Sequence, residues 1–354
     1  MWRRTLLIGG LLVVATVGAV VPDLVAAEPP RVRLITTGGT ISNRPGERLT
    51  PNELLDLVPD LHELAEAEAE EFANVPSSAL TLDQWLRLTR RINQLFSADP
   101  ELAGVVVTSG TDTLEELAFF LHLTVRDERP VVVVGSMRRP ETPGYDGAAN
   151  LRQAFRVASD ESSHGRGVLV VLNDEINSAR EVTKTDALHL QSFEARGYGV
   201  LGTVARDRIV YYRGLERRHT KTSEFDLAGV TRLPRVDVVM TYQGATGGLI
   251  RAAVDQGAKG VVVAGAGAGA TSSGQRDAIA YANERDVRVV IASRTGRGRV
   301  APRPPANGDG DPERQRRRAI AGEDLAPVKA RILLMVGLTE TTDQAELQRM
   351  FAEY

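Results

Sequence analysis

Three polar segments of this chain each follow an apolar run, and their side chains together could perform nucleophilic or acid–base chemistry. They carry Thr37, the pair Thr111-Asp112, and Lys184 within the sequence Thr-Lys-Thr-Asp. A threonine hydroxyl becomes a nucleophile when a neighbouring base takes its proton. A lysine can be this base only when it is neutral, and burial favours the neutral form. A nucleophile, a base and an orienting carboxylate are therefore all available among these residues.

Each polar segment lies where a buried strand is expected to end. Residues 31–43 (RVRLITTGGTISN) predict a strand that leaves its sheet through a glycine turn, which lets a ligand approach the backbone closely. Residues 104–125 repeat the arrangement, with a helix from about Leu114 and with Asp112 and Glu115 as a D-x-x-E capping pair. In one parallel sheet these exits face the same edge, where open α/β sheets bind ligands.

An alternative interpretation needs no site at all. Thr36, Thr37 and Thr40 would be strand-forming residues around a turn, and Lys184 would be a charged surface residue in an ion pair. Each segment by itself fits this interpretation. The coincidence of three such segments after three strands favours a site.

The elements that must position these residues form an α/β fold. Apolar runs at 32–35, 105–107, 130–137 and 167–174 alternate with helical segments, which predicts a larger N-terminal parallel-sheet domain over 31–212, with a flavodoxin-like strand order possible. Within it, residues 49–71 are predicted to be helical, with an acidic face in solvent, and a short strand and loop follow at 71–81.

A second, smaller α/β domain is predicted over 235–354. Residues 213–234 are polar and irregular and are interpreted as a linker. Residues 301–318, rich in Pro, Gly and Arg, predict a mobile loop, and a final packed helix is expected from about Leu325.

The N-terminus predicts export. Arg3 and Arg4 precede an apolar run at 6–21, and small residues end at Ala27, so residues 1–27 fit a signal peptide cleaved after Ala27 and a secreted or periplasmic protein. The two arginines leave the Sec and twin-arginine routes open, and a retained membrane anchor is the alternative. The net charge of −3 argues against nucleic-acid or polybasic membrane partners, and the absence of cysteine excludes disulfides, thiolate metal sites and a Cys nucleophile.

Four motifs occur in order along the chain: TTGGTIS at 36–42, TSGTDTLEE at 108–116, VGSMRRP with YDGAANL at 134–151, and VLNDEINSAREVTKTD at 171–186. They resemble the bacterial-type L-asparaginase/glutaminase family, and AGEDLAPVKARILL at 321–334 extends the resemblance to nearly all of the chain after residue 31. Several motifs in one order are a far more specific signal than any single motif.

The resemblance implies a role for each candidate residue. Thr37 would form an acyl-enzyme with release of ammonia, and Thr111, Asp112 and Lys184 would match the family's second threonine–lysine–aspartate group, with Lys184 supporting proton transfer. Ser77, with Ser78 beside it, would hold the α-carboxylate of the substrate, and Asp112 would pair with its α-amino group. Backbone N–H groups at the exits, such as that of Gly38, could stabilise the oxyanion.

The family also implies an activity and an assembly. The expected reaction is hydrolysis of the side-chain amide of L-asparagine to L-aspartate and ammonia, with a glutaminase-asparaginase of broad specificity as the alternative. The substrate would be a small-molecule amide, with no metal or organic cofactor. The family is usually a homotetramer with its sites between subunits.

The chain departs from the family pattern in the residues around the substrate. The loop ISNRPGERLT lacks the usual tyrosine and is short, Ser109 stands where His or Gln is common, and Ser78 replaces a glutamine. The asparagine that a neighbouring subunit supplies appears as Ala268, and Glu313 is the candidate for the neighbour's acidic residue.

Two rival functions come from other classes. Residues 261–271 (VVVAGAGAGAT) match G-x-G-x-x-A at Gly265, Gly267 and Ala270, and Arg294 after the next strand would permit an NADP-binding oxidoreductase. A secreted amide-binding or degenerate family member is the other rival. The five histidines show no i,i+4 pair and no H-E-x-x-H sequence, so a metal site has no support.

Overall fold

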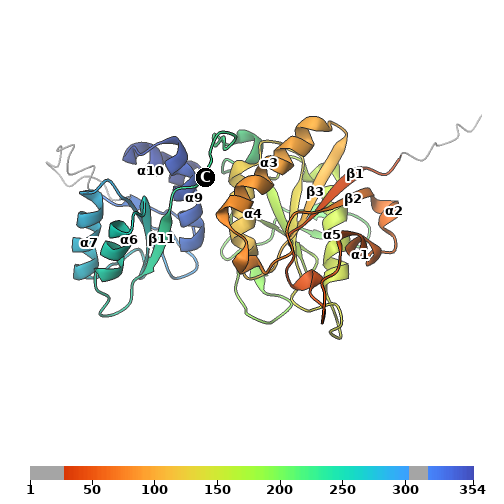
Figure 1. The fold of residues 1–354 in the computed structure, drawn as a ribbon, viewed down its shortest axis with the longest axis horizontal. Helices are drawn as coiled ribbons and strands as arrows, with labels where there is room; N and C mark the ends of the chain where they lie inside the picture. Colours follow the sequence, from red (N-terminus) through yellow and green to blue (C-terminus); the bar gives the residue numbers. More distant parts are fainter. Residues whose placement is uncertain (1–27, 303–317) are drawn as a thin grey trace, which may run out of the picture.

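A computed structural model describes residues 28–302 and 318–354. The predicted signal peptide and most of the predicted loop at 301–318, Glu313 included, lie outside the described residues. Figure 1 shows two α/β domains, each built on its own sheet, with helix α9 on the side of the C-terminal domain that faces the N-terminal one. The predicted two-domain α/β fold is confirmed.

The larger sheet has the strand order β10-β9-β6-β5-β4-β3-β1-β2. Its strands are β1 (Arg31–Thr36), β2 (Glu66–Glu71), β3 (Leu102–Thr108), β4 (Val131–Val134), β5 (Val168–Leu172), β6 (Glu175–Ser178), β9 (Gly202–Val204) and β10 (Ile209–Tyr211). The first five strands are parallel and follow the flavodoxin-like order 2-1-3-4-5. Strands β6, β9 and β10 are antiparallel, so the whole sheet is mixed.

A tight hairpin turns the sheet from parallel to antiparallel. Strands β5 and β6 are joined by Asn173 and Asp174 alone, which both have positive φ, at 52° and 67°. Two consecutive residues with positive φ form a turn whose twist matches the twist of the two flanking strands. Asn and Asp tolerate this conformation. The chain therefore returns beside β5 without a crossover helix.

The strands around the site are buried on both faces, which explains their unbroken apolar runs. Alternate residues of β1 point to opposite faces, so Ile35 packs with one group of helices and Leu34 with the other. Helices α3 (Leu82–Ala98) and α4 (Leu114–Thr124) cover the first face. Helices α1 (Pro51–Asp56), α2 (Leu61–Leu64) and α5 (Gly147–Ala158) cover the second (Figure 1).

The acidic stretch at 66–71 is a strand, and the prediction of a helix there is wrong. Its sequence EAEAEE has the period-two alternation of a strand, with Ala67 and Ala69 packed against the core and Glu66 and Glu68 exposed. The strand β2 forms the edge of the sheet beside β1. Charged side chains on an edge strand oppose pairing with another molecule, so the acidic residues suit this position. The helix predicted to begin at Thr50-Pro51 is confirmed and is short.

The C-terminal domain contains a parallel four-stranded sheet, β11-β12-β13-β14. Its strands and helices are β11 (Val236–Met240), α6 (Gly248–Asp255), β12 (Gly260–Gly265), α7 (Ser273–Asn283), β13 (Arg288–Ser293), β14 (Ile320–Ala321), α9 (Pro327–Glu340) and α10 (Gln344–Glu353). The single final helix of the prediction is therefore two helices. Helix α9 is apolar on nearly all sides because it packs on this sheet and also on α4 of the first domain.

Short elements complete the chain. They are β7 (Thr183–Lys184), β8 (Phe193–Glu194) and the 3₁₀ helices η1 (Thr40–Ser42), η2 (Ser77–Ala79), η3 (Glu161–Ser163) and η4 (Thr220–Thr222). Between β10 and β11 the chain contains only η4, and Phe225 and Leu227 of this segment are buried in the core.

Candidate functional site

Thr37 is the first residue after β1, and it lies against the end of β3. Its backbone N–H donates to the carbonyl oxygen of Thr108 over 3.3 Å, and its hydroxyl donates to the same oxygen over 2.7 Å. The Thr37 side chain is almost completely buried. Strands β1 and β3 flank the point where the strand order reverses, which is where open α/β sheets place their ligands.

The two glycines after Thr37 allow three segments to meet. Gly38 and Gly39 have φ of +98° and +94°, which favours glycine. A Cβ on Gly38 would lie 2.6 Å from the backbone nitrogen of Val75, and one on Gly39 would lie 2.3 Å from that of Gly110. The turn after β1 therefore packs directly on the segment before η2 and on the segment after β3.

Lys184, Thr111 and Asp112 are in direct contact. The Lys184 Nζ donates to the Thr111 Oγ1 over 3.0 Å and to the Asp112 Oδ1 over 2.7 Å. The Lys184 side chain is 13% exposed and that of Asp112 is 78% exposed, whereas Thr111 is buried. Lys184 is thus in an ion pair, as the alternative interpretation expected, but its amine also contacts a buried hydroxyl.

Glu115 determines where Lys184 lies, and the prediction of a capping pair is wrong. Helix α4 has Thr113 as N-cap, with no side-chain capping bond. The Glu115 Oε1 instead accepts hydrogen bonds from the Thr183 Oγ1 at 2.9 Å and from the backbone N–H of Lys184 at 3.1 Å. Asp112 and Glu115 therefore both contact the strand of Lys184.

Ser77 joins this cluster, and Ser78 points elsewhere. The Ser77 Oγ accepts a long hydrogen bond, 3.4 Å, from the backbone N–H of Thr113, and a Cβ on Gly110 would lie 2.9 Å from it. Ser78 is exposed, and among the described residues no hydrogen bond connects it to the other candidates. Of the seven predicted site residues, Ser78 alone makes none of the contacts described above.

The loop after Thr37 is a closed turn, and a tyrosine from another loop supports it. Asn43 and Arg48 form an isolated β-bridge, and Leu49 donates to the carbonyl of Ser42 over 2.8 Å. The Tyr145 hydroxyl donates to the carbonyl oxygen of Ile41 over 2.7 Å. Burial raises the pKa of Tyr145, so the hydroxyl keeps its proton for this bond. Tyr145 lies within the quoted motif YDGAANL, but its contact with a segment 104 residues away has no local signal.

A buried lysine of the second domain also belongs to this region. Lys329 is fully buried in α9, and burial lowers its pKa to about 8, although the carboxylate of Glu115 opposes that shift. Lys329 lies within the motif AGEDLAPVKARILL, whose sequence gives no sign of a role for it. Lysine is almost never buried without partners. The sequence of a helix does not distinguish such a buried lysine from an exposed one.

The glycine turn at 261–271 is closed by hydrogen bonds within the protein. Arg294, the candidate for a nucleotide phosphate, donates to the carbonyl oxygen of Thr241 over 2.8 Å. The hydroxyl of Ser293 bonds the carbonyl of Gly267, and Ala266 pairs with Ala270 across the turn. Ala268 is exposed at its tip.

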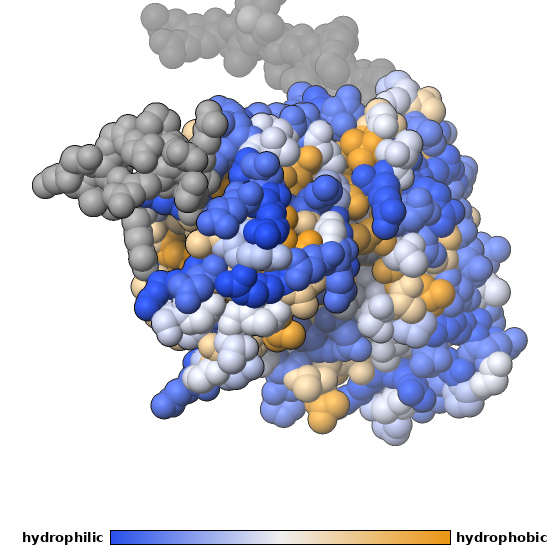
Figure 2. Space-filling view, turned by 60° about the vertical axis from the view of Figure 1, so that its left-hand side comes forward, coloured by the Kyte–Doolittle hydropathy of each residue, from blue (hydrophilic) through white to orange (hydrophobic). Residues whose placement is uncertain are grey.

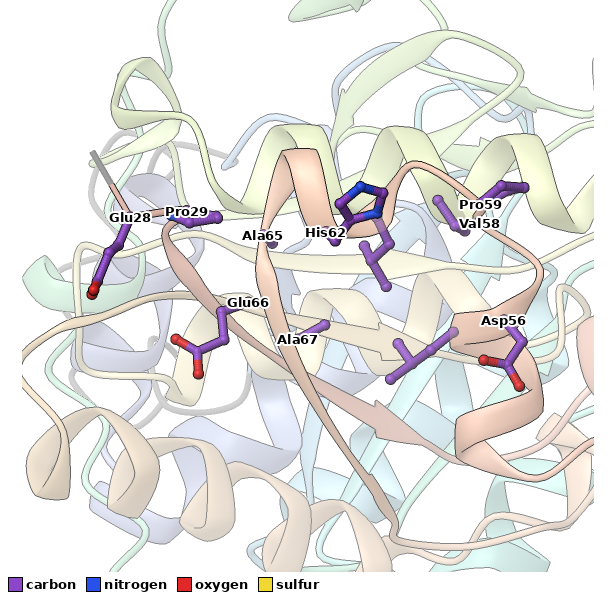
Figure 3. Close-up of a pocket in the computed structure, with 11 residues that line it drawn as sticks. Glu28, Pro29, Asp56, Val58, Pro59, His62, Ala65, Glu66 and Ala67 are labelled. Atoms are coloured by element: carbon purple, nitrogen blue, oxygen red, sulfur yellow. The ribbon is translucent and has the colours of Figure 1, made fainter. Parts of the chain in front are cut away.

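Other features of the described residues lie apart from this site. Figure 3 shows a hollow between α1, α2 and β2, lined by residues that include Asp56, His62 and Glu66, and it contains none of the predicted site residues. Within residues 28–302 and 318–354, no group of three or more His, Cys, Asp or Glu side chains could hold a metal ion. In the same ranges, no helix is both long and apolar enough to cross a membrane.

Two family models together match most of the chain. The model for the N-terminal domain of asparaginase matches residues 31–217, and the model for the glutaminase/asparaginase C-terminal domain matches residues 235–351. The chain belongs to the asparaginase/glutaminase family. It is an amidohydrolase of the L-asparaginase type, as the motifs predicted.

Curated relatives of this asparaginase-family chain carry both names. It is 39% identical over 335 residues to "L-asparaginase 2" of Bacillus subtilis, covering 92% of this chain and 87% of the relative. It is 34% identical to "Probable L-asparaginase periplasmic" of Haemophilus influenzae, with 93% and 94% covered. It is 34% identical to "Glutaminase-asparaginase" of Pseudomonas fluorescens, with 91% and 90% covered.

A solved structure has the same two-domain architecture. The structure titled "Probable Cytoplasmic L-asparaginase" from Campylobacter jejuni superposes with a TM-score of 0.85 at 36% identity, covering 92% of this chain and 99% of the other. The likeness extends over both domains of the asparaginase-family fold.

Proposed function

We propose that the chain hydrolyses the side-chain amide of L-asparagine to L-aspartate and ammonia through an acyl-enzyme on Thr37. One observation carries the proposal. The amine of Lys184 contacts the buried hydroxyl of Thr111 and the carboxylate of Asp112, and this group lies after β3, against which Thr37 packs. Thr37 thus packs on the end of the strand that leads into Thr111 and Asp112, at the reversal point of the sheet.

The reaction would proceed in two steps. The Thr37 oxygen attacks the amide carbon, the carbon–nitrogen bond breaks, and the nitrogen leaves as ammonia after taking up a proton. Water then attacks the ester carbon, which releases aspartate and restores the Thr37 hydroxyl. The Thr37 hydroxyl donates to the Thr108 carbonyl in this structure, and a carbonyl is no base, so the hydroxyl must turn towards another acceptor before attack.

The Thr111 group would handle protons near the substrate. In the Lys184 contact, the Thr111 oxygen accepts and its own proton remains available to a ligand. Lys184 would support the transfer of the Thr111 proton through this contact. The exposed carboxylate of Asp112 can at the same time pair with the α-amino group of an amino-acid substrate.

Asparagine and glutamine are the two candidate substrates, because both carry an α-carboxylate and a side-chain amide. Ser77, half-buried beside Gly110, would hold the α-carboxylate, and the exposed Ser78 would have a smaller part. A glutaminase-asparaginase of broad specificity is the alternative, and the relative from Pseudomonas fluorescens bears that name. The two substrates differ by one methylene, which a site discriminates by only about 1–3 kcal/mol.

We also propose export and self-assembly. The N-terminal pattern favours cleavage after Ala27 and a secreted or periplasmic protein, and a relative named as periplasmic supports this. Large apolar side chains are exposed at and beside the edge strand of the C-terminal sheet, namely Val238 and Met240 on β11, Tyr242 just after it and Leu249 on α6. Figure 2, with this domain turned forward, shows hydrophobic patches within a mostly hydrophilic surface. Such residues support a homo-oligomer, with a tetramer as the expected state.

The test is ammonia release by the purified mature chain on L-Asn, L-Gln, D-Asn and a small peptide amide. Thr37→Ala is the control, and it should fold normally while its turnover falls to background. Release on asparagine that the variant lacks establishes both the reaction and the nucleophile. Normal turnover in Thr37→Ala would remove Thr37 from this role. No release on any amide from a cooperatively folded sample would favour the amide-binding alternative, which a thermal-shift screen with the same compounds would then examine.

A further inference from the structure

A single buried ammonium group donates hydrogen bonds to the backbone carbonyl oxygens just before the strand of Lys184. Lys329, on α9 of the C-terminal domain, is 1% exposed. Its Nζ donates to the carbonyl oxygens of Ala179 at 2.9 Å and Arg180 at 3.0 Å, and to that of Val182 as well. These bonds use all three donors of a lysine. The turn before β7 is therefore held by a side chain from the other domain.

The carboxylate of Glu115 connects this lysine to the strand. Its Oε1 accepts from the Thr183 hydroxyl and from the backbone N–H of Lys184. Its Oε2 has no hydrogen-bond partner among the described residues and lies 4.0 Å from the Nζ of Lys329. A buried carboxylate is stable only when an opposite charge or hydrogen bonds compensate it. Lys329 supplies that charge, so the two residues act on the segment 179–184 from two sides.

We propose that Lys329 and Glu115 are positioning residues that hold the backbone of Lys184, so that its amine stays within reach of Thr111 and Asp112. The inference rests on the proposed amidohydrolase function and extends it, because it places one determinant of activity in the C-terminal domain. Lys329 touches neither the amine of Lys184 nor Thr111, so its effect passes through the backbone. A displacement of about 1 Å in a catalytic group can cost roughly a hundredfold in rate.

The same pair of helices offers a matched control. Arg331 of α9 lies 3.7 Å from Glu116 of α4, one or two residues along each helix from the Lys329–Glu115 pair. Arg331 also donates to the carbonyl of Val236 over 2.9 Å, and none of its contacts reaches the segment 179–184. If the buried pair served only to join the two domains, the loss of either cation would have the same consequences.

The experiment compares Lys329→Met with Arg331→Met in the full mature chain. Both should lower the melting temperature, because both remove an ion pair between α4 and α9. Only Lys329→Met should lower kcat, about 10- to 100-fold, with KM for asparagine changed by less than about twofold. Equal kcat values in the two variants, or an unchanged kcat in Lys329→Met, would overturn the inference.

Two further measurements test the inference when Lys329→Met does not fold or when the chain shows no turnover. If Lys329→Met does not fold, Thr183→Val removes one donor to Glu115 at nearly constant volume and should lower kcat several-fold at constant KM. An unchanged kcat there would count against the inference.

Hydrogen exchange of the Lys184 amide gives a readout that needs no turnover. It should be at least about tenfold faster in Lys329→Met than in Arg331→Met, because the first variant releases the backbone that Glu115 and Lys329 hold. Equal exchange would overturn the inference even if the wild-type chain released no ammonia. A wild-type chain without activity on any amide, but with the predicted difference in exchange, would overturn the proposed function alone.

Discussion

The hydroxyl of Thr37 donates to the carbonyl oxygen of Thr108 over 2.7 Å, although 71 residues separate them in the chain. This bond joins the end of β1 to the end of β3 at the reversal point of the sheet. It fixes the rotamer of the candidate nucleophile in a buried position.

Replacing Lys184 by methionine should abolish turnover while the fold is retained. The variant keeps the aliphatic part of the side chain but loses the amine that contacts Thr111 and Asp112. Ammonia release should fall by at least about a hundredfold, which is the lower limit of the range for a lost proton-transfer group. Lys221→Met is the control, because Lys221 forms an exposed ion pair with Glu128 instead. Equal turnover in the two variants would contradict a catalytic role for Lys184.

Replacing Ser77 by alanine should mainly raise KM. The Ser77 Oγ lies beside Gly110 and the start of α4, where an α-carboxylate could be held. The loss of one hydrogen bond to a charged group corresponds to about 1.5–3 kcal/mol, or roughly a 10- to 150-fold rise in KM. Ser78→Ala should have a smaller effect because Ser78 is exposed and outside the cluster. Steady-state kinetics on asparagine would measure both, and an unchanged KM in Ser77→Ala would exclude it from substrate binding.

Gly39→Ala should destabilise the protein and remove activity, whereas Gly46→Ala should leave activity intact. Both glycines have positive φ, +94° and +88°, so alanine is strained at either position, by roughly 1–3 kcal/mol. At Gly39 the new Cβ would also lie 2.3 Å from the backbone of Gly110, and at Gly46 it would meet nothing within 4 Å. Thermal melting and ammonia release on the two variants would separate strain from displacement of the site. Equal losses would show that the contact with Gly110 does not matter.

The stability of the protein should fall as the pH drops below about 6.5, because His122 is buried in neutral form. Burial, together with the nearby charges of His219, Arg180 and Lys329, holds the pKa of His122 well below its usual value. Its Nδ1 accepts from the backbone N–H of Val168 over 3.1 Å. The unfolded chain binds a proton on this ring near pH 6.5 and the folded chain does not, so acid favours unfolding.

Urea unfolding between pH 5 and 7.5 would measure this effect. One such histidine contributes about 1.4 kcal/mol per pH unit to the slope of the unfolding free energy below about pH 6.5. The variant His122→Gln keeps an acceptor for Val168 and removes the titration, so its slope should be smaller by about this amount. Parallel slopes in the wild type and the variant would show that His122 titrates alike in both states. His219, whose pKa burial also lowers, remains in both proteins.

The elements around the site could be predicted because their signals are local. Strands β1, β3, β4 and β5 are buried on both faces, and their sequences are unbroken apolar runs. Helix α3 begins at a capping box of Thr81 and Gln84, which is also a local signal. Strand β2 differs from its prediction because its glutamate and alanine residues are good helix formers, although they alternate with the period of a strand. The break between α9 and α10 has no clear local signal because both helices pack apolar residues into the same core.

The residue types of the site and their positions at strand exits follow from the amino-acid sequence alone. Thr37, Thr111, Asp112 and Lys184 follow apolar runs, and their motifs indicate the asparaginase/glutaminase family. Three features are seen only in the folded chain: β1 lies beside β3, Glu115 bonds the strand of Lys184, and α9 places a buried lysine behind that strand. Periodicity and capping act over a few residues along the chain, whereas these contacts depend on strand order and on the packing of two domains, which no local pattern encodes.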